Sequence, residues 1–405
     1  MALDFPEDTT MLRGFSIKFC QPRHASTAKF REPPMFARLE SKQQFHAALF
    51  ATLFGDAASG LDRPMLLCRE LNACESHLST MAAPKISICL PNLNHRRFLP
   101  ARIDSIYAQT FQDWELIVVD SHSDDGSWEY MQERFAGDRR VKMFQTPRDG
   151  LYRNWNRCVE HSSGEYVYFA TSDDTFYPQC LERACTALEQ HPKIDLCDFN
   201  IHMLDEQGKV LENKWDNMFN VKVFDGWMHR DHTRSGAADL LMMPCIGTII
   251  VSMTGVLIRR SLFEKTGLFP TEYGPIGDYA WQMMAFTHTD VVHLADYLAT
   301  WRTYEGQLTQ HDTLSNLKRT AKVCSDYASR FDPAFRDSCR QLQVNILRHE
   351  CRNFPRFKRK VLKSPQLALW FWLEKRQGRN PWFTKAWMDQ RFKRDDFRPL
   401  SSSKV

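Results

Sequence analysis

Residues 165–174 read EYVYFATSDD, an apolar run that ends in two adjacent acidic residues. The apolar letters predict a buried strand, and Asp173 and Asp174 follow it directly. Two carboxylates this close are costly to bury unless a cation lies beside them. The pair therefore predicts a site for Mg²⁺ or Mn²⁺, whose remaining ligands would be phosphate oxygens and water. The N-cap of a following helix is the alternative explanation for the same residues.

Upstream of this stretch, strand-like runs alternate with helix-like runs. In order they are KISICLP (85–91), FLPARIDSIYAQ (98–109), WELIVVD (114–120), SWEYMQERF (127–135), VKMFQ (141–145) and LYRNWNRCVEH (151–161). Short apolar strands that alternate with longer helices are typical of a parallel sheet covered on both faces. We predict an α/β fold with an open, mostly parallel sheet flanked by helices.

Polar residues stand where the predicted strands end. Asn92 and Asn94 follow the first strand, Asp120 ends the second, and the acidic pair follows the fourth. Ligands of open α/β sheets bind beyond the carboxyl ends of the strands, so we expect these ends to converge on one cleft. The first turn reads PNLNHRRF, which lacks the glycines of the dinucleotide fingerprint, and no P-loop pattern is present. A metal is therefore expected to hold any phosphate.

These segments resemble the family 2 glycosyltransferases. The resemblance begins at ISICLPNLNHRRFLPARIDSIYAQTFQDWELIVVDSHSDDGS (86–127) and continues through DGLYRNWN, SDD, IGDYAWQMM and WRTYEGQLT. It implies a GT-A fold that binds a nucleotide-sugar and a divalent metal. Matched position by position, it places the donor nucleotide on Pro91, Asn92, Asn94, Asp120, Gly150, Asn156 and Asp173.

The same resemblance assigns the metal and the catalytic base. It implies that Asp173 is the metal ligand, assisted by Asp174, and that Asp278 is the base. The chain departs from the family at Ser121 and Thr171, where the family has Asp. Base recognition then rests on the Asp at the end of the second strand, which is compatible with uridine, guanosine or thymidine. A UDP-sugar is the favoured donor.

The chemistry implied is inverting transfer of a single sugar, because the QxxRW motif of processive synthases is absent. The metal would neutralise the leaving diphosphate, and a base would take the proton of the acceptor hydroxyl. Asp278 opens a helix-like segment, whose N-terminal dipole is expected to keep the carboxylate ionised. An ordinary N-cap is its alternative role. A GT-A-like protein that binds a nucleotide or glycan without catalysis is the second function class.

Composition indicates a globular protein with a large core, since 43% of 405 residues are hydrophobic. We expect an N-terminal extension (1–80), a catalytic domain (81–310) and a helical, basic C-terminal region (311–405). No apolar run approaches the roughly 20 residues that cross a bilayer, and the acidic start MALDFPEDTT is no signal peptide. A cytoplasmic location is expected. The 12 cysteines form no C-x-x-C pair, which favours reduced thiols over disulfides or zinc.

Two segments leave alternatives open. Met81 is followed at once by AAPKISICLP, so residues 1–80 are either a genuine extension or the product of a misassigned start. Residues 213–236 show little periodicity and are predicted to form a loop over the cleft. There Trp215, Trp227 and His229 either contact sugars or are exposed aromatic side chains that pack on the protein.

The C-terminal region is basic and rich in aromatic residues. Residues 352–398 hold fourteen Lys or Arg and four acids, with the apolar run LALWFWL among them. This composition predicts peripheral contact with an anionic membrane, at the inner face of the cytoplasmic membrane. A glycan or a lipid-linked glycan would then be the acceptor, in surface polysaccharide or glycolipid synthesis. A helical pair packed on the catalytic domain is the alternative, and no nucleic acid is expected because no binding module accompanies the charge.

Overall fold

A computed structural model describes residues 83–224, 226–307, 313–327 and 397–400. The predictions for residues 1–80, and for most of the basic C-terminal region, lie outside the described residues. The expected domain boundaries at residues 81 and 311 stay predictions.

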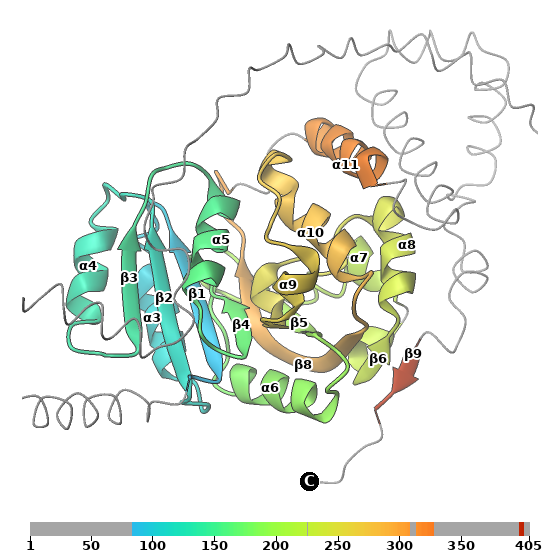
Figure 1. Ribbon diagram of the computed structural model, residues 1–405, viewed down its shortest axis with the longest axis horizontal. Helices are drawn as coiled ribbons and strands as arrows, with labels where there is room; N and C mark the ends of the chain where they lie inside the picture. The colour runs from blue at the N-terminus through green and yellow to red at the C-terminus, as the bar shows by residue number, and fades with distance from the viewer. Residues whose placement is uncertain (1–82, 225, 308–312, 328–396, 401–405) are drawn as a thin grey trace, which may run out of the picture. The chain divides into compact units, whose positions relative to one another are not determined.

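One sheet organises the described part of the chain (Figure 1). Its strands lie in the order β3-β2-β1-β4-β7-β5-β8-β6-β9. The strands are β1 (Ile86–Asn92), β2 (Trp114–Asp120), β3 (Val141–Gln145), β4 (Tyr166–Phe169), β5 (Leu196–Leu204), β6 (His232–Arg234), β7 (Val256–Arg259), β8 (Val291–Arg302) and β9 (Phe397–Pro399).

The sheet is mostly parallel, as predicted. Strands β3, β2, β1 and β4 pair in parallel, and so do β5 and β8. Strand β7 is antiparallel to both of its neighbours, β4 and β5, and β6 is antiparallel to β8 and β9. Every residue of β1 and β2 is buried, which is the pattern of parallel strands covered on both faces.

Helices flank the sheet. They are α3 (Leu99–Tyr107), α4 (Ser127–Arg134), α5 (Leu151–His161), α6 (Cys180–Gln190), α7 (Phe219–Lys222), α8 (Gly236–Ile246), α9 (Leu262–Thr266), α10 (Gly277–Ala285) and α11 (Thr313–Tyr327). Helix α5 packs on β1 and β2, and α6 packs on β5, β7 and β8. Helix α10 contacts α8, α9 and α11. None of the helices in the described ranges is long and apolar enough to cross a membrane.

The prediction of a loop at residues 213–236 is wrong. The segment contains α7, the short 3-10 helix η2 (Trp227–His229) and β6, which pairs with β8. Trp215 is only 5% exposed, and its Nε1 donates to Asn200 Oδ1 at 3.0 Å. Its packing into the core, which a scan for local periodicity cannot detect, explains the irregular pattern.

Candidate active site

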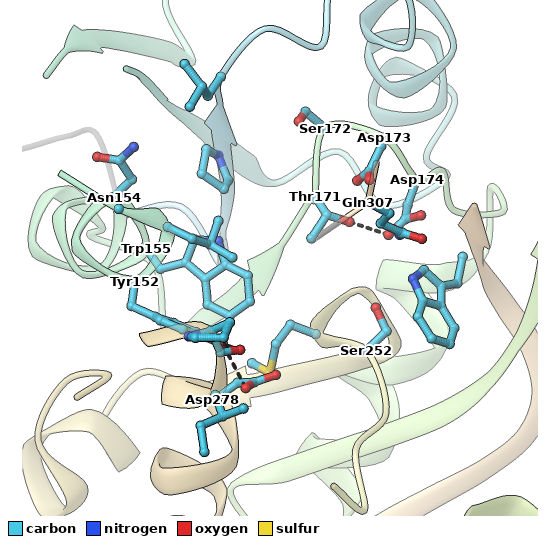
Figure 2. A pocket seen from close by; sticks show the side chains of 18 of the residues that line it. Tyr152, Asn154, Trp155, Thr171, Ser172, Asp173, Asp174, Ser252, Asp278 and Gln307 are labelled. Atoms are coloured by element: carbon cyan, nitrogen blue, oxygen red, sulfur yellow. Dashed lines mark hydrogen bonds between the residues drawn. The ribbon is translucent and has the colours of Figure 1, made fainter. Parts of the chain in front are cut away.

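A cavity of about 700 Å³ opens at the carboxyl ends of β1, β2 and β4, within the size range of small-ligand sites. Side chains from the two halves of the sheet line it together (Figure 2). The predicted site residues that line it are Pro91, Asn92, Gly150, Asp173, Asp174 and Asp278. Asn94, Asp120 and Asn156 are not among its lining residues.

The two acidic residues after β4 have different surroundings. Asp174 is 2% exposed and accepts hydrogen bonds from the Arg302 backbone N at 2.7 Å and from the Thr171 hydroxyl at 2.5 Å. Burial, and next the charge of Asp173, raise the pKa of Asp174. Asp173 is half-buried, and its Oδ2 accepts from the Tyr304 hydroxyl at 3.0 Å. Asp174 therefore ties the loop between β4 and α6 (residues 170–179) to β8. Asp173, in the same loop, is the more accessible carboxylate.

The pair is not the cap of the next helix. Helix α6 begins at Cys180, and Gln179 is its N-cap. Two arginines support the loop instead. Arg302 Nε donates to the Asp173 carbonyl at 2.9 Å, and Arg102 Nε donates to the Thr171 carbonyl at 2.8 Å.

Arg102 was missed by sequence reasoning. It lies on α3 and is fully buried, next to Leu99 and Ile103 of the apolar face. The helical period assigns this arginine to the buried face of the helix. A buried charge needs a partner, so its position could have indicated a functional contact. In the structure that partner is the loop that carries Asp173.

A second group that sequence reasoning missed lies beside the loop. His95 Nδ1 is 2.5 Å from Ser172 Oγ, and its Nε2 is 3.3 Å from the Tyr304 hydroxyl. His95, Ser172 and Tyr304 all line the cavity. They follow β1, β4 and β8 respectively, so only the folded sheet brings them together.

Asp278 is the second residue of α10, and the N-cap is Ile276, so the N-cap alternative for Asp278 is wrong. Its Oδ1 accepts from the Tyr152 hydroxyl at 2.8 Å and from the Tyr279 backbone N at 2.8 Å. No described residue donates to its Oδ2. Figure 2 shows Asp278 and Tyr152 joined at the edge of the cavity.

Burial raises the pKa of the Asp278 carboxyl, although the hydrogen bonds from Tyr152 and Tyr279 lower it. The expectation that the helix dipole keeps this carboxylate ionised stays a prediction, and burial acts against it. Desolvation disfavours the charged form more strongly than these donors favour it. A carboxylate with a raised pKa is a stronger base than an exposed one.

Asp120 is buried at the end of β2. Its Oδ2 accepts from Asn92 Nδ2 at 2.8 Å, and both of its oxygens accept from Ser123. Asn92, at the end of β1, lines the cavity, whereas Asp120 does not. The structure therefore shows Asp120 fixing the Asn92 amide.

Asn94 and Asn156 both brace the backbone around the site. Asn94 adopts a φ of +56°, and its side chain pairs with Asp124. Asn156 bonds the backbone of Phe269 twice, through Nδ2 to the carbonyl and through Oδ1 from the N–H, each at 2.9 Å. Gly150 precedes α5 with a φ of +112°, a conformation that L side chains rarely adopt, and it lines the cavity.

Ser121 takes part in the same wall of the cavity. Its hydroxyl accepts from Asn154 Nδ2, and both residues line the cavity. Arg148, also a lining residue, donates to the Ser121 and His122 carbonyls. The departure from the family at Ser121 thus places a neutral hydroxyl where the family has a carboxylate.

The aromatic residues of 213–236 do not line the cavity. Trp215 is buried, Trp227 is half-buried against the core, and His229 is exposed elsewhere. The alternative of packing on the protein therefore holds for Trp215, and a sugar contact by Trp227 or His229 stays a prediction. Trp301, at the end of β8, is the tryptophan that joins the cavity wall together with Trp155 of α5.

The site fits a divalent metal that takes most of its ligands from a bound diphosphate and water and few from the protein. Within the described ranges, no group of three His, Cys, Asp or Glu could hold an ion by itself. Asp173 offers one accessible carboxylate, and Mg²⁺ in phosphate-binding sites usually takes one or two carboxylates together with phosphate oxygens and water. The donor set therefore suits a metal–diphosphate complex and not a free ion.

Comparison with known proteins identifies the family. Residues 87–267 match the family model "Glycosyl transferase family 2". The putative glycosyltransferase EpsE of Bacillus subtilis is 30% identical over 129 residues, which cover 31% of this chain and 46% of EpsE. A PGL/p-HBAD biosynthesis glycosyltransferase of Mycobacterium tuberculosis is 26% identical over 215 residues, which cover 52% of this chain and 73% of that protein.

A solved structure confirms the fold. S. aureus TarS 1–349, in complex with UDP-GlcNAc, superposes with a TM-score of 0.51 at 18% identity, over 66% of this chain and 72% of TarS. The predicted GT-A fold is confirmed. The family match covers residues 87–267 and identifies this part of the chain as a glycosyltransferase family 2 domain.

Proposed function

We propose that this protein is an inverting, metal-dependent glycosyltransferase that moves one sugar from a nucleoside-diphosphate sugar to an acceptor hydroxyl. The observation that carries the proposal is one cavity with an accessible carboxylate on each side. Figure 2 shows the Asp173 loop and the Asp278–Tyr152 pair facing the same space from different elements. Such a division suits a reaction that needs charge stabilisation on one side and a base on the other.

On the leaving-group side, Asp173 would hold a divalent cation, Mg²⁺ or Mn²⁺, which when bound neutralises charge that develops on the diphosphate. Arg102 and Arg302 hold the backbone of the loop and so fix the position of Asp173. Asp174 serves as an internal brace, because both of its oxygens already accept hydrogen bonds.

On the acceptor side, Asp278 Oδ2 would take the proton of the acceptor hydroxyl. The acceptor oxygen would then attack the anomeric carbon from the face opposite the diphosphate, the bond from that carbon to the diphosphate oxygen would break, and the configuration would invert. Tyr152 fixes the carboxylate by bonding its other oxygen. Ser252 of the cavity wall, with Asn316 and Thr320 from α11, offers polar groups for the acceptor.

A UDP-sugar is the donor that we favour, and Asn92 and Ser121, which line the cavity, would contact the nucleotide. The acceptor in this proposal is a glycan or a lipid-linked glycan, used in surface polysaccharide or glycolipid synthesis. Contact of the basic C-terminal region with an anionic membrane belongs to the same proposal and concerns residues outside the described ranges. Flotation with anionic and with neutral liposomes, before and after removal of residues 352–405, tests it directly.

The decisive test separates binding from transfer. UDP-sugar and GDP-sugar binding is measured by calorimetry with and without Mn²⁺, and sugar release or transfer is measured on the same proteins. We expect Asp173→Ala to lose metal-dependent binding and Asp278→Asn to retain binding but lose transfer. Asp104→Asn is the matched control, because Asp104 is an exposed acid of α3 that pairs with Arg134 outside the cavity.

Two outcomes would contradict the proposal. Wild-type turnover in Asp278→Asn would remove the base assignment. Metal-dependent nucleotide binding without any hydrolysis or transfer by the wild type would favour the second function class, a GT-A-like binding protein.

A further inference from the structure

The Tyr304 hydroxyl joins two groups that are both potential metal ligands. It lies 3.0 Å from Asp173 Oδ2 and 3.3 Å from His95 Nε2. A carboxylate only accepts hydrogen bonds, so the single Tyr304 proton goes to Asp173. The Tyr304 oxygen then accepts from His95, and this requires the Nε2–H tautomer of the imidazole.

The His95 ring is held in place from its other side. Ser172 Oγ lies 2.5 Å from Nδ1, and the ring packs edge-on against Phe98 and Tyr304, with centroid distances of 5.9 Å and 6.4 Å. Imidazoles that bind metals are usually oriented by a hydrogen bond at the second ring nitrogen. A hydroxyl can accept as well as donate, so Ser172 also supports the tautomer in which Nε2 carries a lone pair.

The charges around this point favour a cation. Asp173 and Asp174 are adjacent, and both line the cavity. The nearby Arg97 guanidinium pairs with Glu206 at 2.5 Å, so its charge is already partly balanced. Arg302 donates its side-chain hydrogen bonds to the backbone carbonyls of residues 173, 205 and 206 and not to the Asp173 carboxylate.

We propose that His95 Nε2 is, with Asp173, a protein ligand of the divalent cation, and that the Tyr304 hydroxyl occupies the ligand position between them until the cation arrives. The inference rests on the proposed function, because a nucleoside diphosphate supplies further ligands. Imidazole nitrogen is a poor partner for Mg²⁺ and a good one for transition metals. The site therefore selects Mn²⁺ over Mg²⁺.

The test measures cation binding directly. Calorimetry in the presence of UDP, and of GDP in parallel, compares Mn²⁺ with Mg²⁺, and pulsed electron paramagnetic resonance detects coupling of bound Mn²⁺ to an imidazole nitrogen. The wild type is expected to prefer Mn²⁺ and to show that coupling. His95→Ala is expected to lose the coupling and about tenfold in Mn²⁺ affinity, with little change for Mg²⁺.

Tyr304→Phe sharpens the test. It keeps the ring and removes the competing hydroxyl, so Mn²⁺ affinity is expected to rise. His191→Ala is the matched control, because His191 follows α6 and does not line the cavity. Circular dichroism and thermal melting verify that each variant folds.

The outcomes distinguish this inference from the proposed function. If UDP or GDP binds with metal but His95→Ala keeps the Mn²⁺ preference, or the wild type lacks nitrogen coupling, His95 is not a ligand and the proposed function stands. A fall in Mn²⁺ affinity in Tyr304→Phe would overturn the competing role of the hydroxyl. If neither nucleotide binds the wild type with any cation, the proposed function itself fails.

Discussion

Two groups of carboxylates, one buried in the core and one at the wall of the cavity, differ in how their oxygens are used. Arg234 of β6 bonds both oxygens of Asp198 on β5, at 3.1 Å and 2.6 Å, and bonds Asp239 on α8 at 2.7 Å. His293 also contacts Asp198, at 2.9 Å. In the cavity, Asp278 has no cationic partner among the described residues, and hydrogen bonds reach only one of its oxygens.

The pKa shifts follow the same division. Burial raises the pKa of Asp198, but Arg234 and His293 outweigh it and hold that pKa well below the usual aspartate range. Burial raises the pKa of Asp278, and no cation opposes it. A buried carboxylate whose oxygens are occupied by cations is costly to separate from them, whereas one with an oxygen that accepts no hydrogen bond and with a raised pKa is available for chemistry.

The largest expected effect tests the open carboxylate. Asp278→Asn removes the base and keeps the shape, so turnover is expected to fall by about 10²–10⁴-fold while the free energy of unfolding stays the same or rises. Steady-state kinetics and urea unfolding on one preparation check both. A loss of stability without loss of turnover would show that Asp278, like Asp198 and Asp239, serves the fold and not the reaction.

The reverse pattern is expected at Arg234. Arg234→Met leaves two carboxylates buried without their cation and is expected to lower the free energy of unfolding by about 3–5 kcal/mol. Turnover per folded molecule should be unchanged, because Arg234 does not line the cavity. Restoring part of the stability with Asp239→Asn in the same chain would support this account, and a cost under about 1 kcal/mol would contradict it.

Asn156 extends the comparison to a residue that the family resemblance places at the donor. Because it bonds the Phe269 backbone outside the cavity, Asn156→Ala is expected to lower the free energy of unfolding by about 1–3 kcal/mol. The dissociation constant of the nucleotide should not change. A clear loss of nucleotide affinity with unchanged stability would restore its predicted role as a donor contact.

The smallest effect concerns the acid limb of the pH profile. Turnover requires ionised Asp278, so activity falls as pH drops through the pKa of that carboxyl. The Tyr152 hydrogen bond lowers this pKa, so Tyr152→Phe should move the limb to higher pH by about one unit.

Tyr297→Phe is the matched control for this shift. Tyr297 bonds Asp216 at 2.7 Å outside the cavity, so its loss should not move the limb. A limb at the same pH in Tyr152→Phe and the wild type would show that another group controls the profile.

Local pattern predicted much of the first half of the fold. The bounds of β2, β3 and α5 agree with the predicted runs WELIVVD, VKMFQ and LYRNWNRCVEH. The acidic residues after β4 were found because a parallel sheet collects its strand ends at one edge. Motif order, read together with these elements, was sufficient to identify the family.

The sequence by itself determined the alternation of strands and helices, the polar strand ends and the family, because each depends on residues close together in the chain. Only the tertiary structure decided which carboxylates keep an oxygen that accepts no hydrogen bond from the described residues. Asp278 meets Tyr152 across 126 residues, and Arg302 braces Asp174 across 128. The antiparallel insertion of β7 and the burial of Trp215 likewise depend on partners distant in sequence. Hydrogen bonds and desolvation at these sites are set by such partners, and no local period encodes them.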